Sequence, residues 1–306
     1  MPAGRVDLGP PGPCRFSFVI ATLDDDGDLA HCLQSLAQLL PVQGQDGFEV
    51  IVVDQNPDDR LRGLLAHHAQ WLRIRHLQVD FRGASRARNL GAREALGAWV
   101  AFPDDDCRLL PDLLQQVAHV TEDPGVRVVT GQTVDDAGQP NILRWGARRR
   151  VLTPWNMFAC LTEATLFVER GLFLEVGGFD EAFGPGAPYP AAEGVDLMQR
   201  LLTRAPAGAA VYNPLIRMQH PSKIPPWNAW AVERFHSYAI GDGAVVAKNR
   251  SANLYWWALR TLGSALLQGL FCSGLRGRAF LRRIQGLLTG YLRYRRHAGR
   301  GRHAGA

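Results

Sequence analysis

The sequence has few cysteines, and none of them is spaced for metal binding. Its 306 residues include five cysteines, scattered from Cys14 to Cys272, without a CxxC pair or a Cys/His ligand pattern. An odd number of widely spaced cysteines is typical of a reducing compartment and indicates no structural zinc. An uninterrupted membrane-spanning run is missing too, because Arg260 interrupts the most apolar stretch, 253–272, and a charge within a span is costly.

Several phosphate-binding signatures are also absent. The chain has no Walker P-loop, and no GxGxxG follows its first expected strand, "FSFVIAT" at 16–22. These absences exclude P-loop NTPases and dinucleotide oxidoreductases. Nucleotidyl transferases are disfavoured because no glycine-rich phosphate loop followed by Arg lies near the N-terminus.

The N-terminal segment "MPAGRVDLGPPGPCR" has no apolar core of signal-peptide length. We therefore expect residues 1–15 to form a flexible leader and the protein to stay in the cytoplasm.

The rest of the chain has a globular composition, with 46% hydrophobic and 21% charged residues. Apolar runs at 16–22 and 48–54 predict buried strands, and the segment 28–40 between them has helical spacing. The same alternation continues to about residue 121. Strands alternating with helices predict an α/β fold, with a mainly parallel sheet flanked by helices.

Acidic residues follow three of the expected strands, at Asp24 to Asp26, at Asp54 and at Asp104 to Asp106. Ligands of such sheets bind beyond the carboxyl ends of the strands. Asp104 and Asp106 are separated by one residue, so both can approach one Mg²⁺ or Mn²⁺ ion, which prefers oxygen ligands. The ion would neutralise the repulsion within the triplet and stabilise a leaving diphosphate.

A basic segment, "GASRARNLGA" at 83–92, places Arg86, Arg88 and Asn89 near the start of an expected helix. Guanidinium groups and free backbone N–H groups there favour anions. Alone, the segment is equally typical of an ordinary basic helix, but beside the acidic pair it favours a diphosphate site.

Seven segments in this order resemble the inverting family 2 glycosyltransferases, which have the GT-A nucleotide-diphospho-sugar transferase fold. The segments are "FSFVIATLDDDGDLAHCLQSL", "EVIVVDQNPDD", "GASRARNLGA", "AFPDDDC", "GGFDEAFG", "EGVDLMQRLL" and "MQHP". The resemblance implies a GT-A domain over 16–227. It also implies that the protein transfers a sugar from a nucleotide-diphospho-sugar to an acceptor hydroxyl with inversion, using Mg²⁺ or Mn²⁺.

The resemblance further implies roles for individual residues. The residues it places at the nucleotide-sugar are Thr22, Asp24, Asp54, Arg86, Asn89, Asp104 and Asp105. Asp104, Asp106 and His220 would be metal ligands, although a lone His before Pro is often structural. Phe179, Asp180 and Glu181 would border the acceptor. Trp145 and Trp155 suit either stacking on a sugar or ordinary packing.

The general base is less clearly indicated. The family usually supplies it from a Glu-Asp pair at the start of a helix, but here Glu193 is followed by Gly194 and the next acid is Asp196. Glu193 and Asp196 would lie near one face of the helix, and we rank Glu193 first because it adjoins the vacant position. Both acids also suit a helix N-terminus without any catalytic role. A weak or inactive nucleotide-sugar-binding protein is therefore the alternative.

The C-terminal region, 228–306, is expected to be helical and basic. Its apolar stretch 253–272 and the Arg-rich segment 276–302 favour an amphipathic helix at a membrane surface, while a helix covering the main core is the alternative. Nucleic acid is disfavoured, because the arginines alternate with apolar residues. We expect a peripheral enzyme at the inner face of the plasma membrane, with a carbohydrate or lipid-linked acceptor, in polysaccharide, glycolipid or cell-envelope glycan assembly.

Overall fold

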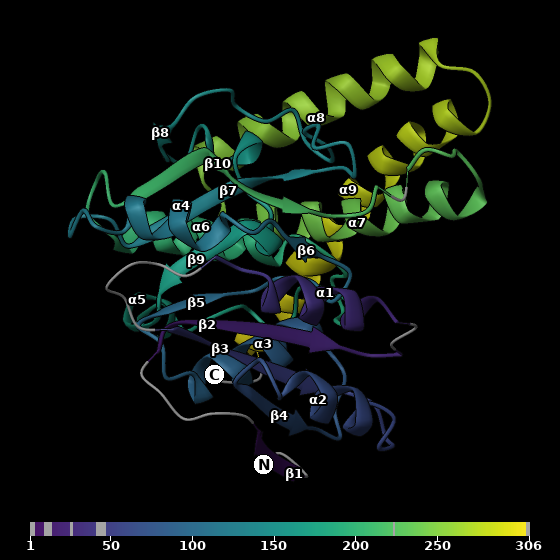
Figure 1. Cartoon of the computed structure of the whole chain (residues 1–306). Coiled ribbons are helices and arrows are strands. Elements are labelled where there is room, and N and C mark those ends of the chain that lie inside the picture. The colour runs from purple at the N-terminus through teal and green to yellow at the C-terminus, as the bar shows by residue number, and fades with distance from the viewer. Residues whose placement is uncertain (1–3, 9–13, 25–26, 41–46, 223, 304–306) are drawn as a thin grey trace. The chain divides into compact units, whose positions relative to one another are not determined.

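The structure is a computed structural model (Figure 1), and it describes residues 4–8, 14–24, 27–40, 47–222 and 224–303. The chain divides into two compact units. The sheet unit contains Met1–Phe179 and Leu197–Ser222, and the helical unit contains Asp180–Asp196 and Lys223–Ala306. The expected boundary after residue 227 therefore differs from the observed division, because the segment Asp180–Asp196 packs with the C-terminal helices.

Ten described strands form one mixed sheet, in the order β1-β4-β3-β2-β5-β9-β7-β10-β6, with β8 paired to β10. The pairs β2–β3, β3–β4, β2–β5 and β7–β10 are parallel. The strand bounds are β1 Gly4–Leu8, β2 Cys14–Thr22, β3 Gly47–Asp54, β4 Ile74–Gln78, β5 Trp99–Ala101, β6 Arg108–Leu109, β7 Val128–Val134, β8 Arg150–Val151, β9 Leu166–Glu169 and β10 Ala210–Gln219.

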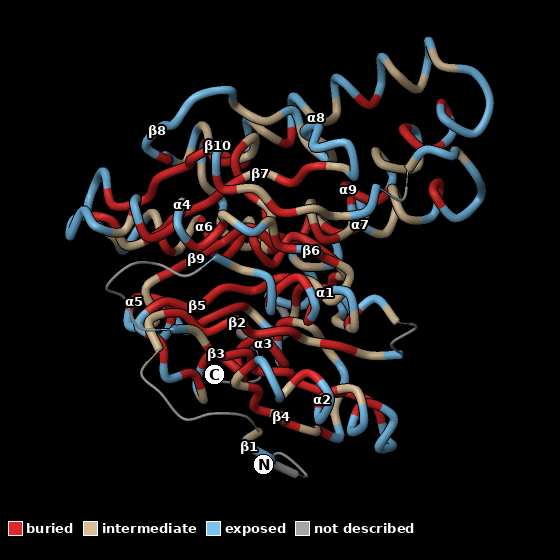
Figure 2. Tube along the Cα trace, in the orientation of Figure 1, coloured by how far each residue is buried: buried red, intermediate tan, exposed pale blue. Residues whose placement is uncertain are grey.

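Side chains alternate between the two faces of the central strands. On one face, Phe18, Ile20 and Val52 join a buried cluster with residues of α1, α2 and α4. On the other face, Val19 lies against Gly91 of α3, where a Cβ atom would overlap the Val19 side chain. The strands are mostly buried as a result (Figure 2). The helices that contribute to the sheet unit are α1 Asp28–Ala37, α2 Arg62–His68, α3 Ala84–Glu94, α4 Leu113–Val120, α5 Arg170–Glu175 and part of α6 Glu193–Arg204.

The expected α/β alternation is confirmed, but the first residues differ from the expected leader. Gly4–Leu8 forms β1, which pairs antiparallel with β4 at the sheet edge. The exposed Asp7 accepts a hydrogen bond from the buried Arg75 of β4, Nε to Oδ1 at 3.2 Å. A paired backbone and an anchored side chain therefore make this segment part of the sheet.

The helical unit is built from α7 Ala229–Asn249, α8 Ala252–Phe271 and α9 Gly274–His303. Helices α7 and α9 approach closely because α9 carries Gly286 and Gly290, whose backbones lie against the carbonyl oxygens of His236 and Ile240. Small residues four apart allow such close helix packing. Among the described residues, none of the helices is both long enough and apolar enough to cross a membrane.

Candidate functional site

Polar side chains gather at the carboxyl ends of the central parallel strands. Thr22 ends β2 and Asp54 ends β3, and the strand register pairs them directly. Both are buried, and the Thr22 hydroxyl has no hydrogen-bond partner among the described residues. A buried hydroxyl without a partner costs free energy, so Thr22 is suited to a ligand at this edge.

Asp54 is enclosed by contacts within the protein. Its Oδ1 accepts hydrogen bonds from the backbone N and Nδ2 of Asn56, each at 2.9 Å, and its Oδ2 lies 2.9 Å from Nε2 of His76. Asn56 in turn accepts a hydrogen bond from the backbone N–H of Asp24 at 2.9 Å. Asp54, fully buried here, thus holds the loop in which Asp24 adopts a positive φ of 55°. Asp25 and Asp26 lie outside the described residues.

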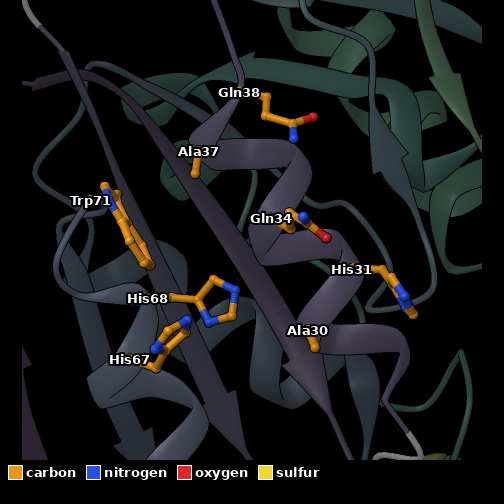
Figure 3. A pocket seen from close by; sticks show the side chains of 8 residues that line it. All are labelled: Ala30, His31, Gln34, Ala37, Gln38, His67, His68 and Trp71. Carbon is orange, nitrogen blue, oxygen red and sulfur yellow. The ribbon is translucent and has the colours of Figure 1, made fainter.

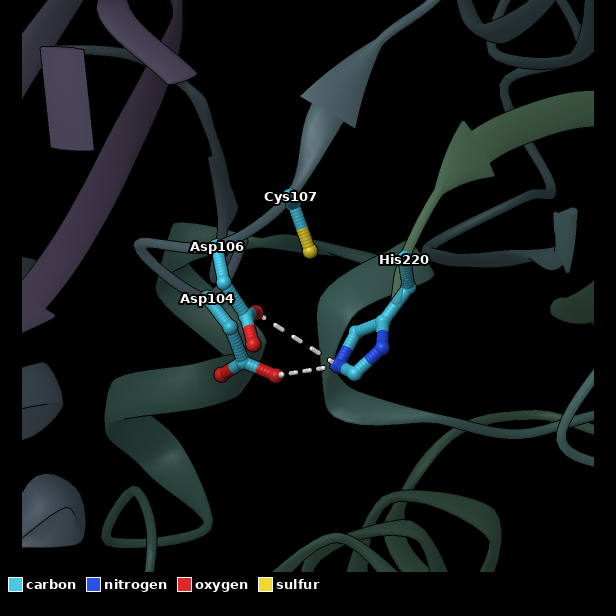
Figure 4. A group of neighbouring side chains, drawn as sticks. All are labelled: Asp104, Asp106, Cys107 and His220. Atoms are coloured by element: carbon cyan, nitrogen blue, oxygen red, sulfur yellow. Dashed lines mark ion pairs between the residues drawn. The ribbon is translucent and has the colours of Figure 1, made fainter. Parts of the chain in front are cut away.

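Asp104, Asp106 and His220, which the resemblance implies as metal ligands, lie close together (Figure 4). Nε2 of His220, beyond the end of β10, lies 3.5 Å from Oδ2 of Asp104 and 3.6 Å from Oδ1 of Asp106. With Cys107, their candidate ligand atoms lie within 4.8 Å of one another. Two carboxylates and an imidazole suit Mn²⁺ well and Mg²⁺ through the oxygens, so the donor set fits a divalent cation.

Cys107 belongs to this cluster by position but differs in chemistry. Its side chain is fully buried, and burial raises the pKa of the thiol well above its ordinary value. A protonated thiol is a poor ligand for hard cations. The carboxylates of the two Asp residues and the imidazole of His220 are therefore the candidate metal ligands. Asp105 is half-buried beside them.

Arg88 is a site residue that the sequence analysis noticed but did not assign. Its Nη2 donates to Oδ1 of Asp104 at 2.5 Å, and its side chain is buried. Burial alone would raise the pKa of Asp104, but hydrogen bonding and charge from His220 and Arg88 outweigh it and lower the pKa to about 2. Asp104 is therefore held ionised. Helical spacing in the sequence could have indicated that Arg88 is buried, because residue 88 lies on the same face of α3 as the buried residues 85 and 92.

Arg86 and Asn89 differ in their exposure and in their contacts. The exposed Arg86 lies with its guanidinium carbon 3.9 Å from the centre of the Phe81 ring. Asn89 is buried, and its amide both donates to the carbonyl oxygen and accepts from the N–H of Phe179, each at 2.8 Å. These bonds brace Asn89 against Phe179, and its expected contact with the nucleotide or its diphosphate stays a prediction.

Phe179, which the resemblance implies beside the acceptor, is buried in the structure. It is 2% exposed, and its ring packs at 5.0 Å from Phe102 and 5.6 Å from Phe173, measured between centroids. Phe179 is therefore a core residue of the sheet unit.

The two tryptophans considered for sugar stacking differ in exposure. Trp145 stacks on Tyr212 with an interplanar angle of 3° and donates from Nε1 to the Asn141 carbonyl oxygen at 2.6 Å. Trp155 is 61% exposed. Packing thus accounts for Trp145, while Trp155 keeps an open ring face.

Two hollows of different character lie in the sheet unit. One, of about 110 Å³, adjoins the acidic cluster and is lined by Asp28, Asp106, Arg108, Asp136, Gln219, His220 and Pro221. The other, of about 480 Å³, lies between α1 and α2 and is lined by amide, imidazole, indole and methyl groups (Figure 3). Only the first of these two has carboxylates to hold a cation, so it is the candidate metal and diphosphate site.

The acids expected to include the general base lie in the helical unit. Asp196 is fully buried, and its Oδ1 lies 2.7 Å from Nζ of Lys248 and accepts from Nδ2 of Asn249 at 3.0 Å. Lys248 also lies 2.7 Å from Oδ2 of Asp180. Asp180 and Asp196 are thus joined through one lysine, which assigns both to an ion-pair network.

Glu193 begins α6 and is 6% exposed. The residue before it, Ala192, has a positive φ of 72°, a conformation that costs a non-glycine residue free energy and often occurs at functional sites. Glu181, by contrast, is exposed. The ion pair with Lys248 gives Asp196 a structural role, and the choice of Glu193 as the general base stays a prediction.

Comparisons with known proteins agree with this arrangement. The family model for glycosyl transferase family 2 matches residues 17–177, more than half of the chain. A pre-mycofactocin glycosyltransferase of Mycobacterium tuberculosis is 26% identical over 231 residues, which cover 69% of this chain and 47% of the relative. An uncharacterized glycosyltransferase of Haemophilus influenzae is 30% identical over 106 residues, covering 35% and 34%. The chain thus spans between a third and a half of the length of these two relatives.

Solved structures show the same fold. A mannosyltransferase from Pyrobaculum calidifontis, in complex with GDP-Man and Mn²⁺, superposes with a TM-score of 0.61 at 18% identity, covering 94% of this chain and 88% of that one. Residues 1–349 of Staphylococcus aureus TarS, in complex with UDP-GlcNAc, give a TM-score of 0.53 at 16% identity, covering 92% of both chains. The expected GT-A fold is confirmed, and the chain belongs to glycosyl transferase family 2.

Proposed function

We propose that this protein transfers a sugar from a nucleotide-diphospho-sugar to an acceptor hydroxyl, with inversion at the anomeric carbon and with Mg²⁺ or Mn²⁺ as cofactor. The observation that carries the proposal is the convergence of Asp104, Asp106 and His220 at the carboxyl edge of a family 2 sheet. Fold neighbours in complex with GDP-Man and Mn²⁺ or with UDP-GlcNAc support the donor class.

The sheet unit would supply the donor site. Asp104, kept ionised beside Arg88, and Asp106 would hold the cation together with His220. When bound, the cation would stabilise the negative charge of the departing nucleoside diphosphate. Thr22, with its unsatisfied hydroxyl, and the exposed Arg86 would contact the nucleotide part.

Glu193 would act as the general base. Its carboxylate would take the proton of the acceptor hydroxyl as that oxygen attacks the anomeric carbon from the side opposite the leaving group. Asp196 is less suited, because an ion pair with Lys248 at 2.7 Å already satisfies its charge. Asp180 would shape the acceptor side indirectly, through the same lysine.

The setting of the reaction is part of the proposal. Basic, apolar C-terminal helices support a peripheral enzyme at the cytoplasmic face of the plasma membrane, acting on a carbohydrate or lipid-linked acceptor. Polysaccharide, glycolipid or cell-envelope glycan assembly would suit such an enzyme.

Calorimetric titration with UDP, GDP and dTDP, each with and without Mn²⁺, tests the donor site. We expect one nucleotide to bind more tightly with the metal, and Asp106→Asn to remove that gain. The exposed Asp123, which does not line this hollow, gives a control variant, Asp123→Asn, that should keep this gain. Equal binding of every nucleotide with and without metal, in wild type and variant alike, would contradict the proposal.

A second candidate function is donor binding with little or no transfer, and Gly194 favours it, because the family's usual second acid is missing there. Release of nucleoside diphosphate from UDP-GlcNAc and GDP-Man separates the two functions. Turnover that falls at least a hundredfold in Glu193→Gln, with unchanged donor affinity, supports transfer. Tight metal-dependent binding with no turnover of any donor supports the binding protein.

A further inference from the structure

The connection between α8 and α9 carries the most exposed large apolar side chain among the described residues. Phe271 ends α8 and is 83% exposed, and Leu270 and Leu267 beside it are 67% and 57% exposed. Leu275, in the first turn of α9, is 40% exposed. These four residues are here called the hairpin tip. They form an apolar surface at the end of the α8–α9 hairpin, and this surface stays exposed when the helical unit is packed.

The apolar surface continues along α8 away from the tip. Tyr255, Trp256, Leu259 and Leu266 are 41–60% exposed. At 3.6 residues per turn these positions fall on one side of the helix. The buried Leu254, Ala258 and Ala265 fall together on a neighbouring side, whose centre is about 120° away around the helix. Helix α8 therefore packs through one face and presents a second apolar face to the surroundings.

Helix α9 repeats this arrangement. Leu281, Leu288 and Leu292 are 47–53% exposed, on the side opposite Gly286 and Gly290, which pack against α7. Leu281 lies against Gly269 of α8, so the apolar faces of the two helices meet near the tip.

Charge around this surface has one sign. From Ser251 to Ala306 the sequence contains ten arginines and no Asp or Glu. Arg282 and Arg283 are paired with Glu233 and Asp242 of α7. Arg276 and Arg278, next to the tip, are exposed.

We propose that the hairpin tip inserts into the interfacial layer of an anionic phospholipid bilayer, with Arg276 and Arg278 on the headgroup phosphates. This inference refines the peripheral location proposed above by naming the contact surface and the lipid charge. Interfacial helices combine an apolar face with basic flanks, and anionic lipids attract such arginines.

Charge decides between the bilayer and other occupants. A second copy of the chain would bring arginines against arginines, with no acidic residue in this segment to offset them. Nucleic acid would satisfy the arginines but would leave Phe271 and Leu270 in water. An anionic bilayer covers both the apolar tip and the charges.

Co-sedimentation of the full chain with vesicles tests the proposal. We expect binding to vesicles of phosphatidylglycerol and phosphatidylcholine, and binding at least tenfold weaker to phosphatidylcholine alone. Phe271→Asp should weaken binding to the anionic vesicles about tenfold or more, because it removes one large apolar side chain and adds a repelled charge. Arg276→Gln with Arg278→Gln should reduce the preference for anionic vesicles.

Leu215 of β10 is the matched control, since it is 58% exposed in the sheet unit. Leu215→Asp should bind vesicles as the wild type does. An environment-sensitive dye on Cys272, which adjoins the tip and is half-buried, should shift to the blue on vesicle addition, in a Cys14→Ser background. Thermal unfolding of each variant establishes that it is folded.

Three results would overturn the proposal. They are absence of binding by the wild type to anionic vesicles, equal binding by Phe271→Asp and wild type, and a stable dimer in sedimentation equilibrium that Leu270→Asp converts to monomer. Nucleotide titration of Phe271→Asp keeps the two proposals separate. If Phe271→Asp loses vesicle binding but keeps metal-dependent nucleotide binding, the substitution affects the hairpin tip and leaves the donor site intact.

Discussion

Nη2 of Arg88 lies 2.5 Å from Oδ1 of Asp104, and both side chains belong to the sheet unit. The guanidinium holds one carboxylate oxygen, while His220 approaches the other at 3.5 Å. Asp104 is therefore oriented before any cation binds. Such preorganised second partners commonly decide how well a metal ligand works.

Replacing Arg88 should weaken the donor site without removing a metal ligand. In Arg88→Met we expect the pKa of Asp104 to rise and Mn²⁺-dependent binding of the preferred nucleoside diphosphate to weaken about 10–100-fold. Calorimetric titration measures this change. Arg93 lies on the exposed side of the same helix, so Arg93→Ala is the control and should bind as wild type. Equal affinity in both variants would show that Arg88 does not support the site.

Lys248 should stabilise the segment that carries Glu193. It joins Asp180 and Asp196, each at 2.7 Å, and Lys248→Met would leave a buried carboxylate without its cation. We expect the free energy of opening of α6 and α7 to fall by about 3 kcal/mol, measured by hydrogen exchange. Asp180→Asn should cost less, because that carboxylate is 30% exposed. A loss in Asp180→Asn as large as in Lys248→Met would argue against this assignment.

Glycines of α9 should be necessary for its packing on α7. A Cβ atom on Gly290 would overlap the carbonyl oxygen of Ile240, so Gly290→Ala should destabilise the helical unit by about 1–3 kcal/mol. In α8, a Cβ on Gly263 would have no atom within 4 Å. Gly263→Ala should therefore stabilise the unit slightly, by up to about 1 kcal/mol. Thermal unfolding of the two variants should shift in opposite directions, and equal shifts would contradict the packing argument.

Asp242 should make the stability of the helical unit depend on pH. Burial raises its pKa above the ordinary 3.8, although Arg283 partly opposes the shift. The folded form then binds more protons than the unfolded form between pH 3.8 and the raised pKa, so this residue's contribution to stability falls as pH rises through that window. As pH rises through the same window, the free energy of unfolding of Asp242→Asn should rise relative to that of the wild type. Above the window, the difference between the two should stay constant. Urea unfolding at several pH values measures the difference, and a flat difference would refute the prediction.

Much of the sheet and part of the site were predictable from the sequence. Apolar runs ending at Thr22 and Asp54 indicated parallel strands, and parallel strands bring their carboxyl ends to one edge. The convergence of His220 with Asp104 and Asp106 followed from the family order of motifs. Segment β1 was missed, because its pairing depends on β4 and its glycine- and proline-rich flanks are typical of loops.

The role of Asn89 was not predictable in the same way. Its bonds to Phe179 join residues 90 positions apart, and no local pattern reports such a contact. Likewise, Asp196 and Lys248 meet only after α6 and α7 have packed. Local sequence determines which side chains are available, while tertiary contacts decide which of them stay open to a ligand.

The pairing of Thr22 with Asp54 restricts how relatives of this chain can vary in length. Both residues reach the edge because β2 and β3 run in register from Phe16 and Phe48 onward. One residue inserted within either strand would turn the following side chains to the opposite face, and either Thr22 or Asp54 would leave the edge. Insertions and deletions in functional homologues should therefore fall before these strands or in the connections between them, and strand length should be inherited unchanged.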